Sequence, residues 1–298
     1  MKQFLENKIK QIRKIEKVKG EASEREFYRL YLDASTLVAM AYPEANPEEI
    51  SRVVYFTELY QKYNIRVPAI IDVIEDRVII QEDLGNELVQ SKLLGSSSGE
   101  IRKILDSVAE ILVKLSSIPP RSTKSTLDKG SMKREMDFFE EHFIGEFYPE
   151  VKQPGNIRDE IHALVDEIQI KNIFTHRDYH SRNMLVHRDE IGLVDIQDSL
   201  QGPEFYDLVS FAYDSYQNLN FHRKYLFKCL ESMGVELNDH QMYLTALQRN
   251  IKALGTFGYQ VWMKDNRNYE GYIKPTIQHI MLNKLSASYI PSLLNLFG

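Results

Sequence analysis

The first part of the chain alternates apolar and polar residues in short runs, a pattern typical of β-strands. Runs at residues 26–32 and 35–40 are separated by only two residues, which predicts a hairpin with a tight turn. Further runs at 67–73 and 77–81 predict two more strands. We therefore expect the N-terminal part of the protein to be rich in β-structure.

Two helices are predicted within this β-rich part. Asn46 is suited to cap a helix that begins at Pro47, because its side chain can accept a backbone N–H and proline fits the first turn. The apolar positions from Ile50 to Tyr60 repeat at helical spacing. Residues 4–13 predict a short amphipathic helix, which we expect to pack on the same domain rather than on a membrane surface.

Beyond a Gly- and Ser-rich segment at residues 94–99, the pattern becomes helical. Apolar residues keep helical spacing from 101 to 115, and two prolines at 119 and 120 end that helix. A short strand pair, 183–186 and 191–195, interrupts the later helices. This order predicts a β-rich domain with one main helix, residues 1–85, and a larger, mostly helical domain, residues 86–298.

Composition narrows the possible partners and location. A chain of 298 residues is long enough for two lobes with their own cores, and its net charge of −6 argues against a nucleic-acid partner. The single cysteine excludes an intramolecular disulfide. No apolar run approaches the length of a membrane-spanning helix, and the basic N-terminus has no apolar core typical of a secretory signal. We therefore expect a cytoplasmic protein without membrane insertion.

The candidate chemistry lies at the short strand pair. The pattern H-R-D-x-x-x-x-N begins at His176, and Asp195 follows at the end of an apolar strand. Phosphoryl transfer from a magnesium nucleotide requires a carboxylate that accepts the hydroxyl proton, and oxygen ligands for Mg²⁺. Asp178 is predicted for the first role, and Asn183 with Asp195 for the second. Each residue alone could be a loop acid or a turn residue, but their types and spacing together favour kinase chemistry.

This motif resembles that of the aminoglycoside phosphotransferase-like branch of the protein-kinase-like fold. Within that branch it is most similar to the bacterial N-acetylmuramate/N-acetylglucosamine anomeric kinases. Residues 20–30, 195–210 and 248–257 are similar to the nucleotide loop, the metal-binding segment and a late helical segment of that group. The resemblance implies an α+β, bilobal fold, with an antiparallel N-lobe sheet and one main helix, a larger helical C-lobe, and ATP between the lobes.

The resemblance also implies nucleotide-binding residues. The stretch Q-E-D-L-G looks like a hinge, so backbone groups of Glu82 and Leu84 are expected to contact adenine, while the Asp83 side chain is expected to be solvated. Gly20 and Ser23 are expected to contact the phosphates through backbone N–H groups and the serine hydroxyl.

The sequence departs from the pattern of this fold in two places. Met40 stands on the strand where a phosphate-binding lysine is expected, and Arg25, Arg29 or Arg52 could replace that cation. Asp195 begins D-I-Q rather than D-F-G, and no A-P-E follows, so a peptide-directed protein kinase is disfavoured.

We therefore expect an ATP- and Mg²⁺-dependent kinase that phosphorylates a small-molecule acceptor, with a hydroxyl of an amino sugar, such as its anomeric hydroxyl, as the leading interpretation. Choline, an amino acid or an aminoglycoside are alternative acceptors, and a nucleotide-binding regulatory protein without turnover is an alternative of another class. Asp207 is expected to brace the loop that carries Asp178. No local motif identifies the acceptor pocket, to which Arg249, Tyr259, Trp262 and Asp265 are possible contributors.

Overall fold

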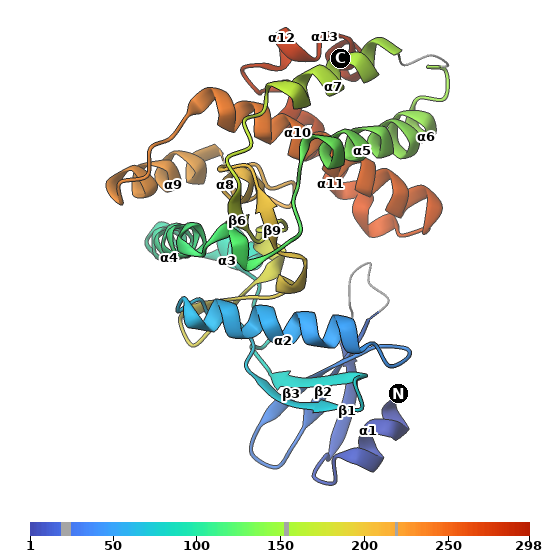
Figure 1. Ribbon diagram of the computed structural model, residues 1–298, viewed down its shortest axis with the longest axis vertical. Coiled ribbons are helices and arrows are strands. Elements are labelled where there is room, and N and C mark those ends of the chain that lie inside the picture. Colours follow the sequence, from blue (N-terminus) through green and yellow to red (C-terminus); the bar gives the residue numbers. More distant parts are fainter. Residues whose placement is uncertain (19–24, 152–154, 218–219) are drawn as a thin grey trace. The chain divides into compact units, whose positions relative to one another are not determined.

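The alternating runs near the N-terminus form an antiparallel sheet in the structure, a computed structural model (Figure 1). The structure describes residues 1–18, 25–151, 155–217 and 220–298, without the side chains of residues 220 and 221. Within these residues the chain divides into two compact units. The N-terminal unit comprises Met1–Leu88 and Met184–Gln197, and the helical unit comprises Val89–Asn183 and Asp198–Gly298. The boundary after residue 85 stays a prediction about the protein's domains.

The described N-terminal unit contains a five-stranded sheet in the order β1-β2-β3-β5-β4, with antiparallel neighbours throughout. Its elements are α1 (Lys2–Lys8), β1 (Lys14–Val18), β2 (Glu26–Tyr31), β3 (Thr36–Ala41), α2 (Pro47–Lys62), β4 (Ile70–Ile74) and β5 (Val78–Glu82). The predicted hairpin and main helix are present. The N-terminal helix, however, ends at Lys8 rather than near residue 13. Residues 14–18 instead pair with the edge of β2, where Ile15 becomes buried.

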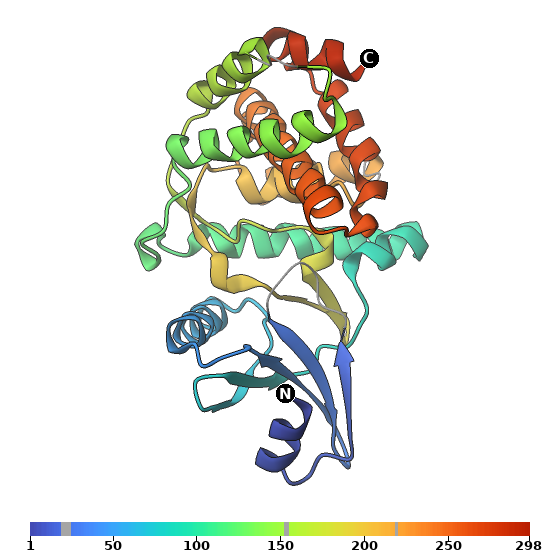
Figure 2. The same cartoon turned by 90° about the vertical axis from the view of Figure 1, so that its right-hand side faces the viewer.

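Helices cover both faces of this sheet (Figures 1 and 2). Leu5 of α1 is fully buried against one face, beside Leu30 and Ile80, so the predicted packing of this helix on its own domain is confirmed. The other face meets α2, whose Ile50 and Val53 form an apolar cluster with the strand residue Met40, among others.

The short hairpin of β7 (Met184–His187) and β8 (Glu190–Leu193) belongs to the N-terminal unit despite its late place in the sequence. The Val186 N–H donates to the Glu87 carbonyl at 2.7 Å, and the Leu193 N–H donates to the Arg66 carbonyl at 2.9 Å. Gly192 allows this approach, because a Cβ there would lie 2.5 Å from Leu84 Cδ1.

The helical unit is built around a long buried helix, α10, which packs against α5, α8 and α11 (Figure 2). Its helices are α3 (Val89–Gly95), α4 (Ser98–Ser117), α5 (Lys129–Phe139), α6 (Gly145–Phe147), α7 (Gly155–Glu167), α8 (Tyr206–Ala212), α9 (Asn220–Ser232), α10 (Asp239–Gly258), α11 (Glu270–Met281), α12 (Ser286–Tyr289) and α13 (Pro291–Phe297). π-helical turns at Glu140–Ile144 and Tyr259–Met263 follow α5 and α10.

Local sequence signals explain how α4 begins and ends. Ser97 forms a capping box with Glu100, in which each side chain bonds the other residue's backbone N–H. The helix ends at Ser117, two residues before Pro119, because proline cannot continue the backbone hydrogen bonding. The predicted helix over 101–115 and its end before the two prolines are therefore confirmed, but the helix begins earlier than predicted, at Ser98 within the Gly- and Ser-rich segment.

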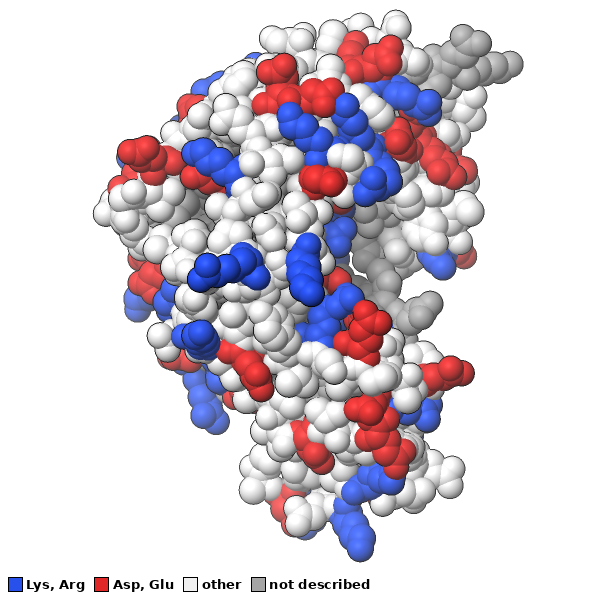
Figure 3. Space-filling view, viewed as in Figure 1, with Lys and Arg blue, Asp and Glu red and all other residues white. Residues whose placement is uncertain are grey.

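The surface drawn in Figure 3 carries interspersed acidic and basic side chains.

Within the described residues, no helix combines the length and apolar character needed to cross a membrane.

Candidate active site

The loop that begins at His176 is fixed by a buried aspartate of α8. Strand β6 (Ile173–Thr175), paired with β9 (Leu200–Gly202), leads directly into this loop. Asp207 accepts the backbone N–H of His176 at 2.6 Å and that of Arg177 at 3.0 Å, so its predicted bracing role is confirmed. The two bonds hold Arg177 at a φ of 76°, a left-handed conformation that non-glycine residues rarely adopt.

A second buried aspartate holds the other end of the loop. The Asp214 Oδ2 atom accepts the backbone N–H of Ser181 at 3.0 Å and its hydroxyl at 2.6 Å. Both Asp214 and Ser181 are fully buried. Asp214 was not predicted from the sequence, because no local pattern links it to a loop more than thirty positions earlier.

Asp178 lies between these two anchoring points and faces α10. Its Oδ1 atom is 3.6 Å from the ammonium nitrogen of Lys252, and its side chain stays partly exposed. Desolvation alone would raise the pKa of Asp178, but the charges of Lys252, His180 and Arg177 outweigh it and hold that pKa well below its usual range. Asp178 is therefore ionised at neutral pH.

Asn183 is oriented by the same loop. Its side-chain amide nitrogen donates to the Asp178 carbonyl at 3.0 Å, and its backbone N–H donates to the His180 carbonyl at 2.9 Å. The donor side of the amide is thus bound within the loop, and no described residue donates to its Oδ1 atom. This orientation leaves a carbonyl-type oxygen available to a cation.

Asp195 follows β8 in the N-terminal unit. It adopts a φ of 63°, which aspartate tolerates better than most residues. Its Oδ1 atom accepts the Arg25 Nη2 at 2.8 Å and the Gln197 side-chain amide at 2.9 Å, while no described residue donates to its Oδ2 atom. A carboxylate with one oxygen fixed and one open is suited to a divalent cation.

The donor chemistry of Asn183 and Asp195 fits Mg²⁺, which prefers oxygen ligands and is usually bound through one or two carboxylates together with substrate phosphates. Among the described residues, no group of three or more His, Cys, Asp or Glu is placed to hold a metal. The pair of Asn183 and Asp195 is not such a group, because it contains one carboxylate and one amide.

The predicted hinge follows β5. The Glu82 carboxylate binds Arg66, and its backbone N–H donates to the Ala69 carbonyl at 2.8 Å. Leu84 is buried. The adenine contacts of Glu82 and Leu84 stay predictions. Gly20 and Ser23 of the predicted phosphate loop lie outside the described residues.

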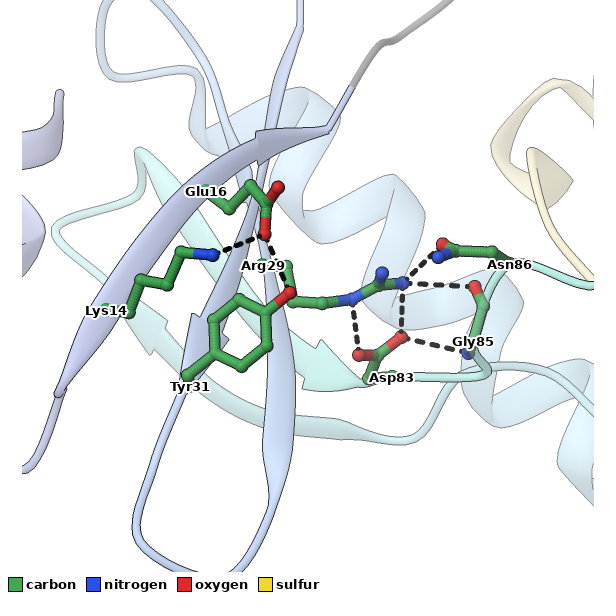
Figure 4. A network of polar contacts seen from close by, with 7 residues as sticks. All are labelled: Lys14, Glu16, Arg29, Tyr31, Asp83, Gly85 and Asn86. Atoms are coloured by element: carbon green, nitrogen blue, oxygen red, sulfur yellow. Dashed lines mark hydrogen bonds and ion pairs between the residues drawn. The ribbon is translucent and has the colours of Figure 1, made fainter.

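The expectation that Asp83 is a solvated acid is wrong. Its side chain is only 5% exposed and pairs with Arg29 through two hydrogen bonds of 2.6 and 2.9 Å (Figure 4). The same guanidinium also binds the Gly85 carbonyl and Asn86. Burial would raise the pKa of Asp83, but these partners keep it below its usual value. The sequence could not show this, because Arg29 reaches Asp83 from β2 rather than from a sequence neighbour.

The side chains suggested for the acceptor pocket have different surroundings. Arg249 on α10 is buried, and its Nη1 atom has no hydrogen-bond partner among the described residues. Tyr259 contacts the rings of Phe138 and His142. Trp262 and Asp265 are exposed.

Several known proteins are similar to this chain. It is 28% identical over 205 residues to an N-acetylmuramate/N-acetylglucosamine kinase of Neisseria meningitidis serogroup B, a match that covers 66% of this chain and 60% of that kinase. The chain thus spans about three fifths of the length of the curated relatives it matches.

Solved structures establish the fold. An ADP-bound aminoglycoside phosphotransferase, APH(2'')-Ib, superposes with a TM-score of 0.67 at 14% identity, covering 93% of this chain and 96% of that one. The choline kinase LicA of Streptococcus pneumoniae gives 0.66 at 11% identity, again covering 93% and 96%. The predicted kinase-like fold, with an antiparallel N-terminal sheet and a mostly helical remainder, is confirmed.

The sequence profile of the phosphotransferase enzyme family matches residues 14–225. This match covers most of the chain and includes both the loop of Asp178 and the hairpin that precedes Asp195. The predicted resemblance is thereby confirmed, and the chain belongs to the phosphotransferase enzyme family.

Proposed function

We propose that this protein is an ATP-dependent small-molecule kinase, and that its acceptor is a hydroxyl of an amino sugar. The observation that carries the proposal is the state of Asp178. Its loop is fixed at both ends by Asp207 and Asp214, and its carboxylate is kept ionised beside Lys252. A fixed, ionised carboxylate within hydrogen-bonding reach of a hydroxyl can orient that hydroxyl and take its proton.

The chemical step then follows. The acceptor oxygen attacks the γ-phosphorus of ATP, its proton passes to the Asp178 carboxylate, and the bond from that phosphorus to the β,γ-bridging oxygen breaks to release ADP. Phosphoryl transfer leaves little covalent chemistry for the protein to perform. Positioning of the reactants and neutralisation of the phosphate charge therefore supply most of the rate acceleration. The anomeric hydroxyl of a sugar is more acidic than an ordinary alcohol, so a carboxylate with a low pKa suffices as its base.

Asn183 and Asp195 are the residues that would hold Mg²⁺. The support is local to each residue, since each offers one oxygen that no described residue donates to. When bound, the metal neutralises charge on the phosphate oxygens. Glu82, Leu84, Gly20 and Ser23 are proposed to contact the adenine and phosphates, as the family resemblance implies.

Two observations favour an amino sugar over a cationic acceptor. Positive charge lies beside the proposed base, because Lys252 is 3.6 Å from the Asp178 carboxylate and Arg177 also acts on it. Two aromatic rings of the helical unit, Tyr216 and Tyr272, already have an arginine over them. The Arg182 guanidinium lies 4.7 Å from the ring centre of Tyr216 and 5.4 Å from that of Tyr272. The similarity to N-acetylmuramate/N-acetylglucosamine kinases supports the same choice.

A panel of acceptors tests this proposal. Magnesium-dependent ATP consumption is measured with N-acetylglucosamine, N-acetylmuramate, choline and an aminoglycoside, and the product of any active sugar is identified by phosphorus NMR. We expect turnover with at least one amino sugar. Turnover with choline or the aminoglycoside alone would contradict the acceptor assignment, and ATP binding without turnover on any compound would favour a regulatory protein.

Replacing the proposed base gives a sharper test. Asp178→Asn keeps the shape of the side chain but removes its negative charge, so we expect kcat to fall at least about 100-fold, as is typical for loss of general base catalysis. ATP affinity, measured by calorimetry, should change little. Asp137→Asn, which removes an exposed acid of α5, serves as the matched control and should keep normal turnover. Near-normal kcat in Asp178→Asn would reject the assignment.

A further inference from the structure

The strand position expected to carry a phosphate-binding lysine has no cation. Met40 of β3 is 4% exposed, and its side chain belongs to the apolar cluster that includes Ile50 and Val53 of α2. A charged group in that cluster would be costly, because burial removes its water without supplying a partner. A cation that serves nucleotide phosphates must therefore come from another position.

Arg25 places a guanidinium at the end of the Met40 side chain. Arg25 directly precedes β2, in which Phe27 is the register partner of Met40. Its Nη1 atom lies 3.9 Å from the Met40 sulfur, and its Nη2 atom lies 2.8 Å from Asp195 Oδ1. The Arg25 side chain is 16% exposed. The guanidinium is thus fixed next to the carboxylate proposed to bind the metal.

The other two candidate arginines, Arg29 and Arg52, form ion pairs with acids outside the proposed site. Arg29 forms the two-bond pair with Asp83 and also binds Gly85 and Asn86 (Figure 4). Arg52 lies on α2 and pairs with the acids one turn before it, with a distance of 3.0 Å to Glu49. Of the three, Arg25 is the arginine that contacts a residue of the proposed site.

We propose that Arg25 replaces the missing strand lysine and exchanges partners between two states of the protein. In the nucleotide-free protein it neutralises Asp195. In the nucleotide-bound protein it binds phosphate oxygens, for which the planar fork of the guanidinium is well suited. The proposal rests on the proposed ATP-binding function and adds to it the residue that recognises the phosphates.

This exchange predicts that Arg25 has opposite effects on two affinities, the one for Mg²⁺ and the one for the nucleotide. Arg25 occupies Asp195 Oδ1 and repels a divalent cation, so it weakens the binding of Mg²⁺ in the absence of nucleotide. The same charge attracts the triphosphate, so it strengthens nucleotide binding. A residue that only kept Asp195 in position would instead support both ligands.

The test compares Arg25→Gln, Arg25→Lys and the control Arg52→Gln in the full-length protein. Calorimetry measures the affinity for ATP in EDTA. In the absence of nucleotide, the melting temperature is measured at increasing Mg²⁺ concentrations, and the midpoint of its rise reports the affinity for Mg²⁺. For Arg25→Gln we expect ATP affinity to fall at least about tenfold, while the Mg²⁺ midpoint moves to lower concentration. Arg25→Lys should recover most of the ATP affinity, and Arg52→Gln should resemble the wild type.

The outcomes separate this inference from the proposed function. If the wild type binds ATP and Arg25→Gln binds it within twofold as well, Arg25 is not the phosphate-binding cation. A parallel loss of ATP and Mg²⁺ binding would also overturn the proposal, because Arg25 would then merely support Asp195. Failure of the wild type to bind ATP would reject the proposed function itself. If Arg25→Gln does not fold, an Arg25→Lys protein that loses tenfold or more in ATP affinity contradicts the exchange.

Discussion

At the scale of single residues, the site depends on buried carboxylates that do no chemistry themselves. Asp207 is buried and accepts two backbone N–H groups at the start of the loop. Its environment is unfavourable for charge. Burial raises the pKa of Asp207 to about 7, against the opposing effect of the two N–H groups. Asp178, which follows Arg177 in the same loop, is held ionised by nearby cations instead.

This difference predicts a pH dependence of stability. In the unfolded chain Asp207 titrates near its ordinary value of 3.8, so between that value and about 7 the folded protein binds more protons than the unfolded chain. The contribution of Asp207 to the free energy of unfolding therefore falls as pH rises through this window, with a slope that approaches about 1.4 kcal/mol per pH unit. Above about 7 the slope from this group disappears.

Urea unfolding of the wild type and Asp207→Asn from pH 5 to pH 8 measures this contribution. The variant is expected to be less stable by about 1–3 kcal/mol near neutral pH, because one backbone N–H loses its acceptor. The difference between the two proteins should shrink from pH 5 to pH 7 and then stay constant. A difference that is constant over the whole range would show that Asp207 does not titrate there.

At the scale of elements, α10 positions Lys252 by packing very closely on α5 and the turn after it. A Cβ at Gly255 would lie 2.8 Å from Phe139 Cα, and one at Gly258 would lie 2.1 Å from the His142 carbonyl oxygen. Both neighbours are backbone atoms, which cannot move without separating the helices. Glycine at these two positions therefore sets the distance between the helices.

Gly255→Ala and Gly258→Ala are expected to destabilise the protein by about 1–3 kcal/mol or more, as for other overpacked cores. Gly271→Ala is the matched control. It lies in α11, where a Cβ would have no atom within 4 Å, so alanine should stabilise the helix by about 0.5–1 kcal/mol. Thermal unfolding measures all three variants. Equal melting temperatures for Gly258→Ala and Gly271→Ala would contradict the packing argument.

At the scale of the whole molecule, the chain leaves the N-terminal unit after Leu88 and returns to it for Met184–Gln197. Asp178 and Asn183 therefore belong to the helical unit, whereas Asp195 belongs to the N-terminal unit with Arg25. The residues proposed for the chemistry are therefore divided between the two units along the chain.

This division predicts the behaviour of a fragment. Residues 1–88 alone lack the two backbone hydrogen bonds from Val186 and Leu193 and the packing of β8 against Leu84. Adding residues 184–197 through a flexible Gly–Ser linker should raise the free energy of unfolding by at least about 1 kcal/mol. Urea unfolding of the two fragments makes the comparison, with a third fragment that carries the same linker and a scrambled 184–197 segment as control. Equal stability of all three would contradict the assignment of the hairpin to this unit.

The sequence by itself determined the features that depend on near neighbours. Strands β2 to β5 and the main helix of the N-terminal unit, the Asn46 cap and the end of α4 before its prolines all follow from local spacing and backbone chemistry, whereas β1 was not predicted. So does the H-R-D-x-x-x-x-N loop, because its residues lie within one short segment.

Only the tertiary structure decided the pairings between distant segments. It placed Asp214 against Ser181, Arg29 against Asp83, and Arg25 against Asp195. Periodicity reports which face of an element is apolar, but it carries no information about which distant side chain lies opposite. Those partners depend on how packing brings distant elements together. A charged side chain therefore meets its partner only in the folded protein.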